Sequence, residues 1–191
     1  MTRIGIIVGS TRPNRRGAAI GRWVHQVATR RSDADFDLID LDDIGLPLLD
    51  EPLPPAVGAE PEHEHTRRWA RTVDTYDGFV LVSPEYNHSV PAALKNALDF
   101  LFAEWNNKAV GMVTYGSAGG VRAGEHLRQI VGELKMADVR AQVTLQFGAD
   151  FDEHWQFRPR EFQAQMLHGM LDELVAWSEA LANVRAVRQS A

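Results

Sequence analysis

The fold is decided near the start of the chain by the stretch IGIIVGSTRPNRRG, residues 4–17. Residues 4–8 form an unbroken apolar run, which is typical of a strand buried on both faces of a parallel sheet. A loop rich in glycine, arginine and hydroxyl side chains follows, and residues 18–31 carry apolar side chains at helical spacing. A strand, a polar loop and a helix in this order predict the first unit of an α/β domain.

The same alternation of strand and helix continues along the rest of the chain. Further strands are predicted at residues 36–41, 78–83, 109–115 and 139–145, and further helices at 66–76, 91–102, 121–136 and 161–187. The strand at 36–41 alternates around two aspartates and is expected at the sheet edge. The proline-rich residues 42–62 are predicted to form a long surface loop. On the last helix, one apolar stripe is predicted to comprise Phe162, Met166, Met170, Leu174, Trp177 and Leu181.

This pattern predicts a five-stranded parallel sheet with helices on both faces, in a single domain over residues 1–191. The net charge of −6 and the lack of a basic block argue against nucleic acid as a partner. The chain has no cysteine, which excludes disulfides and thiolate sites and fits a reducing cytoplasm. No apolar run approaches the ~18 residues of a membrane span, and the N-terminus does not resemble a secretory signal. We therefore expect a cytoplasmic protein with no membrane partner.

In sheets of this kind, ligands bind beyond the carboxyl ends of the strands, so the loops after the first, third and fourth strands are the candidate site. The first loop, residues 9–17, leads directly into a helix, whose free N–H groups and dipole favour an anion. Its arginines add donors suited to phosphate. The loop contains neither GxGxxG nor GxxxxGK[ST], so a single phosphate fits better than a pyrophosphate or a triphosphate.

The other two loops have residues suited to a planar conjugated ring. Residues 83–91 offer a phenol ring, an amide and hydroxyls between two prolines, which supply stacking and polar contacts. Residues 115–120 contain three glycines, which permit a close backbone approach and leave N–H groups free for a ligand. In the helix after the second loop, Lys95 and Asn96 are candidates for tying that helix to neighbouring loops.

Three segments together resemble the NAD(P)H-dependent FMN reductases, a family that includes azo-dye, quinone and chromate reductases. They are GSTRPNRRG after the first strand, SPEYNHSVPAALKNALDFL after the third and YGSAGG after the fourth. The resemblance covers residues 3 to about 145. It implies a flavodoxin-like, three-layer α/β sandwich and an oxidoreductase with FMN as cofactor and NADPH or NADH as co-substrate. It also implies a small electron acceptor, such as a flavin, a quinone, an azo compound or a metal oxyanion.

The resemblance also assigns site residues. Ser10, Arg12 and the backbone around Gly17 would hold the FMN phosphate, with help from Arg15 or Arg16. Pro84, Glu85, Tyr86 and Asn87 would line the flavin ring, and Ser117, Gly119 and Gly120 would close its other edge. Many relatives have Ser or Asn where this chain has Arg16-Gly17. Hydride transfer between stacked rings needs no acid or base, so no catalytic side chain is assigned. A phosphate contact specific to NADPH is open among Arg12, Arg15, Arg16 and Arg122.

Several alternatives stay open at this stage. A flavodoxin-type electron carrier would bind FMN without turning over NADPH, and a binding module could retain the fold without activity. The family is usually dimeric or tetrameric, which makes a homodimer or homotetramer the expectation. Leu98, Phe100, Leu101, Phe102 and Trp105 fit either a partner-facing helix or the chain's own core. His63 and His65 are predicted to diverge on a helix, so no metal ligand is assigned.

Overall fold

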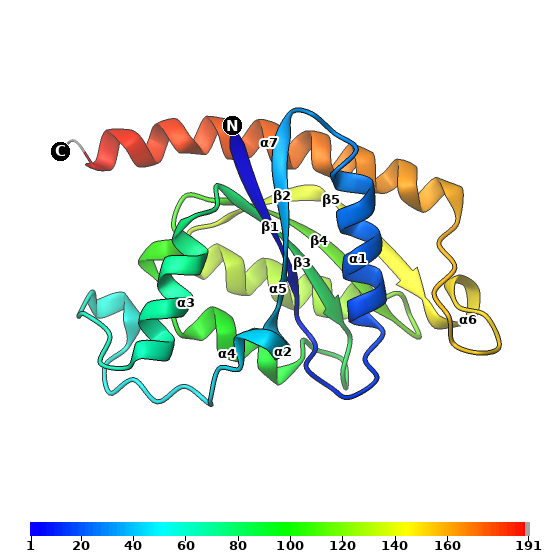
Figure 1. Cartoon of the computed structure of the whole chain (residues 1–191), viewed down its shortest axis with the longest axis horizontal. Helices are drawn as coiled ribbons and strands as arrows, with labels where there is room; N and C mark the ends of the chain where they lie inside the picture. Colours follow the sequence, from blue (N-terminus) through cyan, green and yellow to red (C-terminus); the bar gives the residue numbers. More distant parts are fainter. Residues whose placement is uncertain (190–191) are drawn as a thin grey trace.

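The computed structural model describes residues 1–189 and has a five-stranded, all-parallel sheet in the order β2-β1-β3-β4-β5 (Figure 1). The strands are β1 (Thr2–Val8), β2 (Ala34–Asp40), β3 (Gly78–Pro84), β4 (Ala109–Gly116) and β5 (Ala137–Gln146). The longer helices are α1 (Gly17–Ala28), α3 (Glu64–Asp74), α4 (Ala92–Asp99), α5 (Val121–Glu133) and α7 (Glu161–Gln189). The predicted doubly wound fold is thereby confirmed, with β2 at the edge as expected.

Helices cover both faces of the sheet and divide the core in two. On one face, α1 and α7 pack on the sheet through residues such as Ile20, Val24 and Leu171. On the other face, α3, α4 and α5 contribute residues such as Trp69 and Leu94. All residues of β3 and β4 are buried, which is why these strands appear in the sequence as continuous apolar runs.

The proline-rich segment between β2 and α3 is more structured than the sequence predicted. It contains the short helix α2 (Leu41–Ile44) and a 3₁₀ helix (Pro55–Val57). Asn96 of α4 fixes its path, because the Asn96 side chain donates to the Pro47 carbonyl at 2.7 Å and accepts from the Leu49 N–H at 2.9 Å. The suggested role of Asn96 in tying α4 to a neighbouring loop is thus observed, whereas Lys95 pairs with Asp99 on its own helix at 2.6 Å.

The predicted apolar stripe of the last helix is wrong in part. Met170 and Leu174 are buried, but Phe162, Met166 and Trp177 are exposed. The face of α7 that packs on the sheet consists instead of Leu167, Met170, Leu171, Leu174 and Val175. Apolar residues occur on two adjacent faces of this helix, so their spacing alone does not show which face is buried.

The apolar residues around the end of α4 belong to the chain's own core. Leu98, Phe100, Leu101 and Trp105 are buried, and Phe102 is half-buried. The Trp105 indole N–H donates to the Leu98 carbonyl at 3.1 Å, and its ring packs against Phe79 at 5.0 Å between centroids. Of the two interpretations of this segment, the intramolecular core is the one observed.

Residues 147–160, between β5 and α7, form an aromatic cluster that the sequence analysis did not predict. Phe147, the first residue of α6 (Phe147–Asp150), packs against Phe151 at 5.4 Å and Trp155 at 5.7 Å between centroids. Phe147 also contacts Tyr115 at the end of β4 at 6.2 Å, so the cluster borders the candidate site. No helix in residues 1–189 is both long enough and apolar enough to cross a membrane.

Candidate functional site

The three loops singled out in the sequence meet at one edge of the sheet, as expected from the parallel strands. In the register of the sheet, Val8 lies opposite Val82 and Pro84 lies opposite Tyr115. The first loop is joined to the third strand directly, because the Gly9 N–H donates to the Val82 carbonyl at 2.9 Å. The topological switch of the strand order lies between β1 and β3, which is where a ligand is expected.

The first loop presents the uncapped start of a helix. A turn closed by the Arg15 N–H and the Arg12 carbonyl at 3.1 Å brings the chain around, with Asn14 in the left-handed region at φ 56°. Helix α1 then begins at Gly17, and the side chain of its N-cap residue, Arg16, makes no capping hydrogen bond. Free N–H groups at the positive end of a helix dipole form a site suited to an anion such as phosphate.

The arginines of this loop differ in what they contact. The Arg15 guanidinium is held by Asp40 at 2.6 Å and Asp42 at 3.0 Å, which raises its pKa through the hydrogen bond to Asp40. Arg12 instead lies over the Tyr86 ring, with its guanidinium carbon 5.8 Å from the ring centroid. Arg16 similarly lies 5.9 Å from the centroid of the Trp155 ring. The loop therefore offers Arg12 and Arg16 to a ligand, and Arg15 serves to anchor the loop to the β2 end.

Tyr115 is a site residue that sequence reasoning missed. Its hydroxyl is buried beneath the start of α1, and a Cβ atom at position 17 would lie 2.7 Å from it, so Gly17 is required there. The Ser10 side chain and the Gly17 N–H lie next to this hydroxyl, but within residues 1–189 no group is aligned for a full hydrogen bond to it. Burial raises the pKa of Tyr115, so the hydroxyl remains protonated and able to donate. An aromatic residue at the end of a buried strand, just before a glycine-rich loop, was the available signal.

The second loop joins the first through a hydroxyl pair. The Ser10 hydroxyl and the Tyr86 hydroxyl lie 2.7 Å apart. Tyr86 and Ser89 exchange backbone hydrogen bonds at 2.9 and 3.1 Å around a tight turn. Asn87 and His88 occupy the turn at φ 49° and 75°, a left-handed conformation that Asn adopts with little strain. The Asn87 side chain is exposed at the tip of this turn.

Glu85 has a different position from the one predicted. Its buried carboxylate accepts from the Arg122 N–H at 3.1 Å and forms an ion pair with the Arg122 guanidinium. Burial would raise the pKa of Glu85, but the hydrogen bonds from Arg122 outweigh burial and lower it. Glu85 thus caps the first turn of α5 and joins the second loop to the third.

The third loop is a tight glycine turn that Thr114 and Gln146 hold in place. Gly119 and Gly120 have φ of 73° and 72°, and a Cβ atom on Gly120 would lie 2.6 Å from the Tyr115 nitrogen. The Thr114 hydroxyl donates to the Gly119 carbonyl at 2.9 Å, and the Gln146 amide donates to the Ser117 carbonyl at 3.0 Å. The backbone can therefore approach a ligand closely, as the glycine pattern predicted.

Comparison with known proteins agrees with this geometry. Residues 2–150 match the model of the NADPH-dependent FMN reductases. The chain belongs to this family. It is 41% identical over 135 residues to an NAD(P)H-dependent FMN reductase of Schizosaccharomyces pombe, which covers 70% of this chain and 68% of the relative. It is 30% identical over 143 residues to a 2-hydroxy-1,4-benzoquinone reductase of Burkholderia sp, covering 69% and 71%.

A solved structure shows the same fold. The flavoenzyme NAD(P)H:acceptor oxidoreductase FerB of Paracoccus denitrificans superposes with a TM-score of 0.73 at 21% identity, over 94% of this chain and 98% of that one. The predicted flavodoxin-like fold and the predicted family are both confirmed. As a member of this FMN reductase family, the chain is an NAD(P)H-dependent oxidoreductase with FMN as its flavin.

The residues around the three loops fit FMN. A phosphate needs donors, and the start of α1, the guanidinium of Arg12, which forms no ion pair within residues 1–189, and the buried hydroxyl of Tyr115 all lie at the same end of the site. A flavin ring needs a flat surface and a close backbone, which Tyr86 and the glycines of the third loop provide. Among the predicted residues, the side chains of Arg15 and Glu85 are engaged in ion pairs with Asp40 and Arg122.

The prediction that His63 and His65 diverge on a helix is wrong. His63 precedes α3 and has an extended backbone, with φ −102° and ψ 141°, whereas His65 is helical. Because the chain changes direction between them, the two rings lie 5.1 Å apart between centroids at an interplanar angle of 32°. Only His65 lies in the helix, so the helical spacing on which the prediction depended does not apply to this pair.

Proposed function

We propose that FMN binds across the three loops, with its phosphate at the start of α1. The observation that carries this proposal is the meeting of Ser10, Tyr86 and Tyr115 beside the uncapped N-terminus of α1. Ser10, Arg12 and the N–H groups around Gly17 donate to the phosphate, and the Tyr115 hydroxyl adds a donor from below. Arg16 assists from the side of Trp155. Arg15 acts indirectly, because Asp40 and Asp42 already occupy its guanidinium.

The flavin ring lies between the second and third loops in this proposal. Pro84, Tyr86 and Asn87 line one side, and Ser117, Gly119 and Gly120 close the other. Glu85 keeps the two loops together through its contacts with Arg122. Bound FMN supplies the redox chemistry, accepting hydride from NAD(P)H and delivering electrons to the acceptor. The chain's own residues position the ring and exclude water, and no side chain is assigned as acid or base in the hydride step.

The acceptor that we propose first is a small quinone. The relatives include a 2-hydroxy-1,4-benzoquinone reductase, and a quinone has the flat shape that the site would accept in place of the nicotinamide. Free flavin, azo compounds and metal oxyanions are the other acceptors to compare. Among the arginines considered for NADPH, Arg15 and Arg122 are held by carboxylates, which leaves Arg12 and Arg16 as the candidates for the additional phosphate.

We also propose a cytoplasmic homodimer or homotetramer. The absence of cysteine from the sequence suits a reducing compartment. Exposed apolar residues occur both on the proline-rich segment, at Leu48 and Leu53, and on α7, at Phe162 and Trp177. Surfaces of this kind on a folded chain are typical of contacts between subunits.

Anaerobic mixing of the FMN-loaded protein with NADPH, and separately with NADH, tests the proposed function. We expect rapid loss of visible flavin absorbance, and the ratio of the two rates gives the preference for one nicotinamide. Addition of benzoquinone should then restore the absorbance. A flavin that stays oxidised with both nicotinamides would contradict the proposal and favour the electron-carrier alternative.

A further inference from the structure

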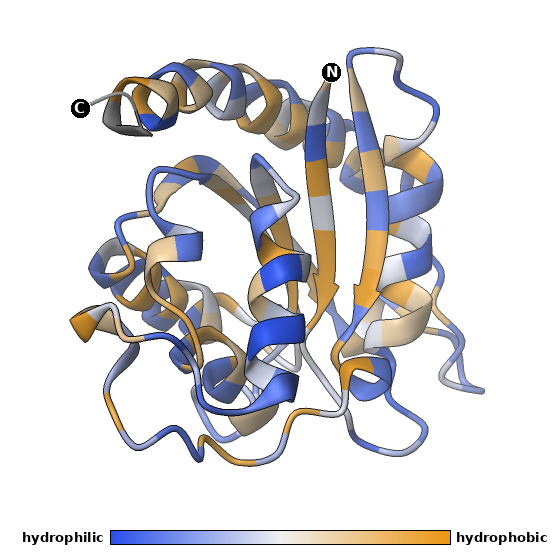
Figure 2. Cartoon of the chain, turned by 60° about the vertical axis from the view of Figure 1, so that its left-hand side comes forward, coloured by the Kyte–Doolittle hydropathy of each residue, from blue (hydrophilic) through white to orange (hydrophobic). Residues whose placement is uncertain are grey.

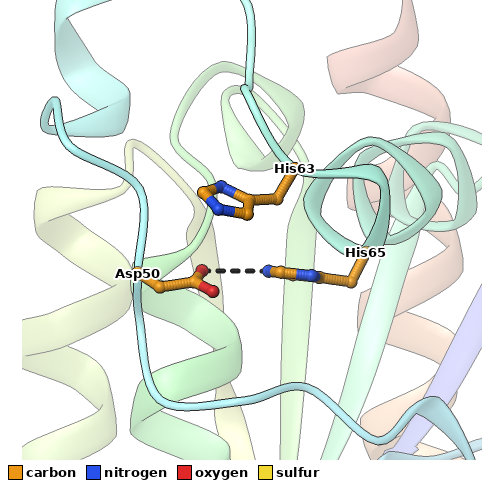
Figure 3. Close-up of side chains that lie close together, drawn as sticks. All are labelled: Asp50, His63 and His65. Carbon is orange, nitrogen blue, oxygen red and sulfur yellow. Dashed lines mark hydrogen bonds and ion pairs between the residues drawn. The ribbon is translucent and has the colours of Figure 1, made fainter.

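A cluster of metal-ligating side chains lies outside the flavin site, where the proline-rich segment meets the start of α3. Asp50 comes from the segment, and His63 and His65 flank the first residue of the helix (Figure 3). One ligand atom from each of the three side chains lies within 4.8 Å of the other two. The reductase chemistry described above uses none of these residues.

The three side chains face a common point. His65 Nε2 lies 2.9 Å from Asp50 Oδ1. His63 Nδ1 lies 3.4 Å from Glu51 Oε1. The other ring nitrogen of His63, Nε2, is therefore the one that can bind a metal ion together with Asp50. In Figure 3 the His63 ring stands over the carboxylate of Asp50 and beside the ring of His65. Two imidazole nitrogens and one carboxylate oxygen thus converge from a loop, a helix cap and a helix.

Neighbouring groups hold the two imidazoles in these orientations. The carboxylate of Glu51 is nearly buried, and it accepts from the N–H groups of Glu62 and His63 at 2.9 and 3.2 Å. It therefore faces His63 Nδ1 from a fixed position, as the outer carboxylate does in a carboxylate–histidine–metal arrangement. The His65 ring packs edge-on against Phe100 at 5.7 Å between centroids, which fixes the second imidazole.

We propose that Asp50, His63 and His65 bind a divalent first-row transition-metal ion of the zinc type. Two imidazoles and a carboxylate are ligands that Zn²⁺ and its neighbours favour, and metal–ligand distances of about 2.0–2.2 Å place tetrahedral ligand atoms roughly 3.4 Å apart. The His65–Asp50 separation of 2.9 Å needs to widen by about half an ångström to reach that geometry, and a pair at the 4.8 Å limit of the cluster needs to close by about 1.4 Å. Three protein ligands leave at least one position for water.

The ion would connect Asp50 of the proline-rich segment to the start of α3, in addition to the hydrogen bonds that already hold the residues on either side of Asp50. Asn96 already holds Pro47 and Leu49 against α4 on one side of Asp50. On the other side of Asp50, Glu51 holds the backbone of Glu62 and His63. Metal binding would therefore stabilise the segment that borders α4, the helix that follows the second flavin loop.

Titration of the 191-residue chain with Zn²⁺, with flavin content measured in parallel, tests the site. We expect one Zn²⁺ per chain, and a rise in Kd of at least about 100-fold in His65→Gln and in Asp50→Asn, since loss of a ligand exceeds the 10–100-fold effect of an outer partner. His154→Gln is the matched control, because His154 is an exposed histidine next to Glu153 and should leave the Kd unchanged. Circular dichroism and the metal-free unfolding midpoint check that each variant folds.

Co²⁺ provides a second readout that depends on the ligands themselves. The wild-type protein and His154→Gln should give visible absorption bands with Co²⁺, and both site variants should lose them. Flavin binding should be the same in all of these proteins, so failure of the metal proposal is distinct from failure of the proposed function. Equal Zn²⁺ affinity in the wild type and both site variants, or no binding by the wild type at micromolar concentrations, would overturn the proposal.

Discussion

At the scale of single residues, the contacts of each arginine determine what it has left for a ligand. Within residues 1–189, Arg12 forms no ion pair and lies over Tyr86, whereas Arg15 is bound by Asp40 and Asp42. A hydrogen bond to a charged group contributes roughly 1.5–3 kcal/mol, so Arg12→Ala should raise the Kd for FMN by about 10- to 100-fold. Riboflavin, which has no phosphate, should bind equally well to the wild type and the variant.

Titration of flavin fluorescence with both ligands measures this difference. Arg15→Ala is the matched control, because carboxylates already occupy the Arg15 guanidinium. We expect this variant to have a lower unfolding midpoint and a Kd for FMN close to that of the wild type. If Arg12→Ala weakens riboflavin as much as FMN, Arg12 does not bind the phosphate.

A second prediction at this scale concerns Lys108, which is buried just before β4, at the end of the sheet opposite the flavin loops. Its ammonium donates to the Val73 carbonyl at 2.9 Å, and its closest carboxylate oxygen, on Asp74, is 4.0 Å away. Burial lowers the pKa of Lys108 from 10.5 to about 8. The unfolded state therefore binds the proton more tightly, and the charged lysine destabilises the fold by roughly 3 kcal/mol below pH 8.

This penalty should disappear as the pH rises from 8 to 10.5. Lys108→Met removes the titrating group, so the free energy of unfolding of the wild type should rise over that range relative to the variant. Urea unfolding of both proteins at several pH values gives the comparison. Parallel curves for the two proteins would show that Lys108 keeps an ordinary pKa.

At the scale of elements, Glu85 joins the second flavin loop to α5. It caps the Arg122 N–H and pairs with the Arg122 side chain, and its pKa is lowered despite burial. A lowered pKa means that the ionised carboxylate stabilises the fold above the unfolded-state pKa of about 4.5, and that this contribution is lost as the pH falls through the folded-state value. Glu85→Gln should thus cost about 1 kcal/mol at pH 7, as expected for a lost cap.

Urea unfolding at pH 7 and pH 3 measures the effect of Glu85→Gln at both ends of the titration. The difference between wild type and variant should shrink at the lower pH, because pH 3 lies below the unfolded-state pKa of about 4.5 and the unfolded protein then binds the proton. Glu125→Gln is the control on the same helix, because Glu125 is exposed in its pair with Arg128 and should change stability little at either pH. A loss that is equal at the two pH values would mean that Glu85 does not act through its charge.

The elements that the sequence predicted well are those defined by local patterns. The buried strands appear as continuous apolar runs, and the loops at their ends were correctly placed because parallel strands share one carboxyl edge. The side-chain contacts that the sequence did not predict join residues that are far apart in the chain. The sequence alone does not indicate that Asp40 engages Arg15, or that Glu85 faces α5. Which apolar face of α7 is exposed depends on how the helix packs on the sheet. The convergence of His63 and His65 depends on the residue at which α3 begins.

At the scale of the whole molecule, two apolar surfaces lie on different sides of the chain. Leu48 is 80% exposed and Leu53 is 52% exposed on the segment between α2 and α3, where hydrophobic colours recur along the loop in Figure 2. Phe162 and Trp177, 46% and 47% exposed, lie on α7 along the opposite edge of the view in Figure 1. A symmetric dimer would cover one of these surfaces, and a tetramer with dihedral symmetry would cover both.

Light scattering after size exclusion distinguishes these assemblies. We expect the wild type to exceed the 21.3 kDa of one chain. The double variant Leu48→Glu, Leu53→Glu should lower the mass, because charge is costly in a buried apolar contact. Trp177→Glu should leave a dimer unchanged if the dimer is formed through Leu48 and Leu53, should dissociate a dimer formed through α7, and should reduce a tetramer to a dimer. The proposed homo-oligomer would be contradicted if the wild type has the mass of a single chain, since both apolar surfaces would then be exposed in solution.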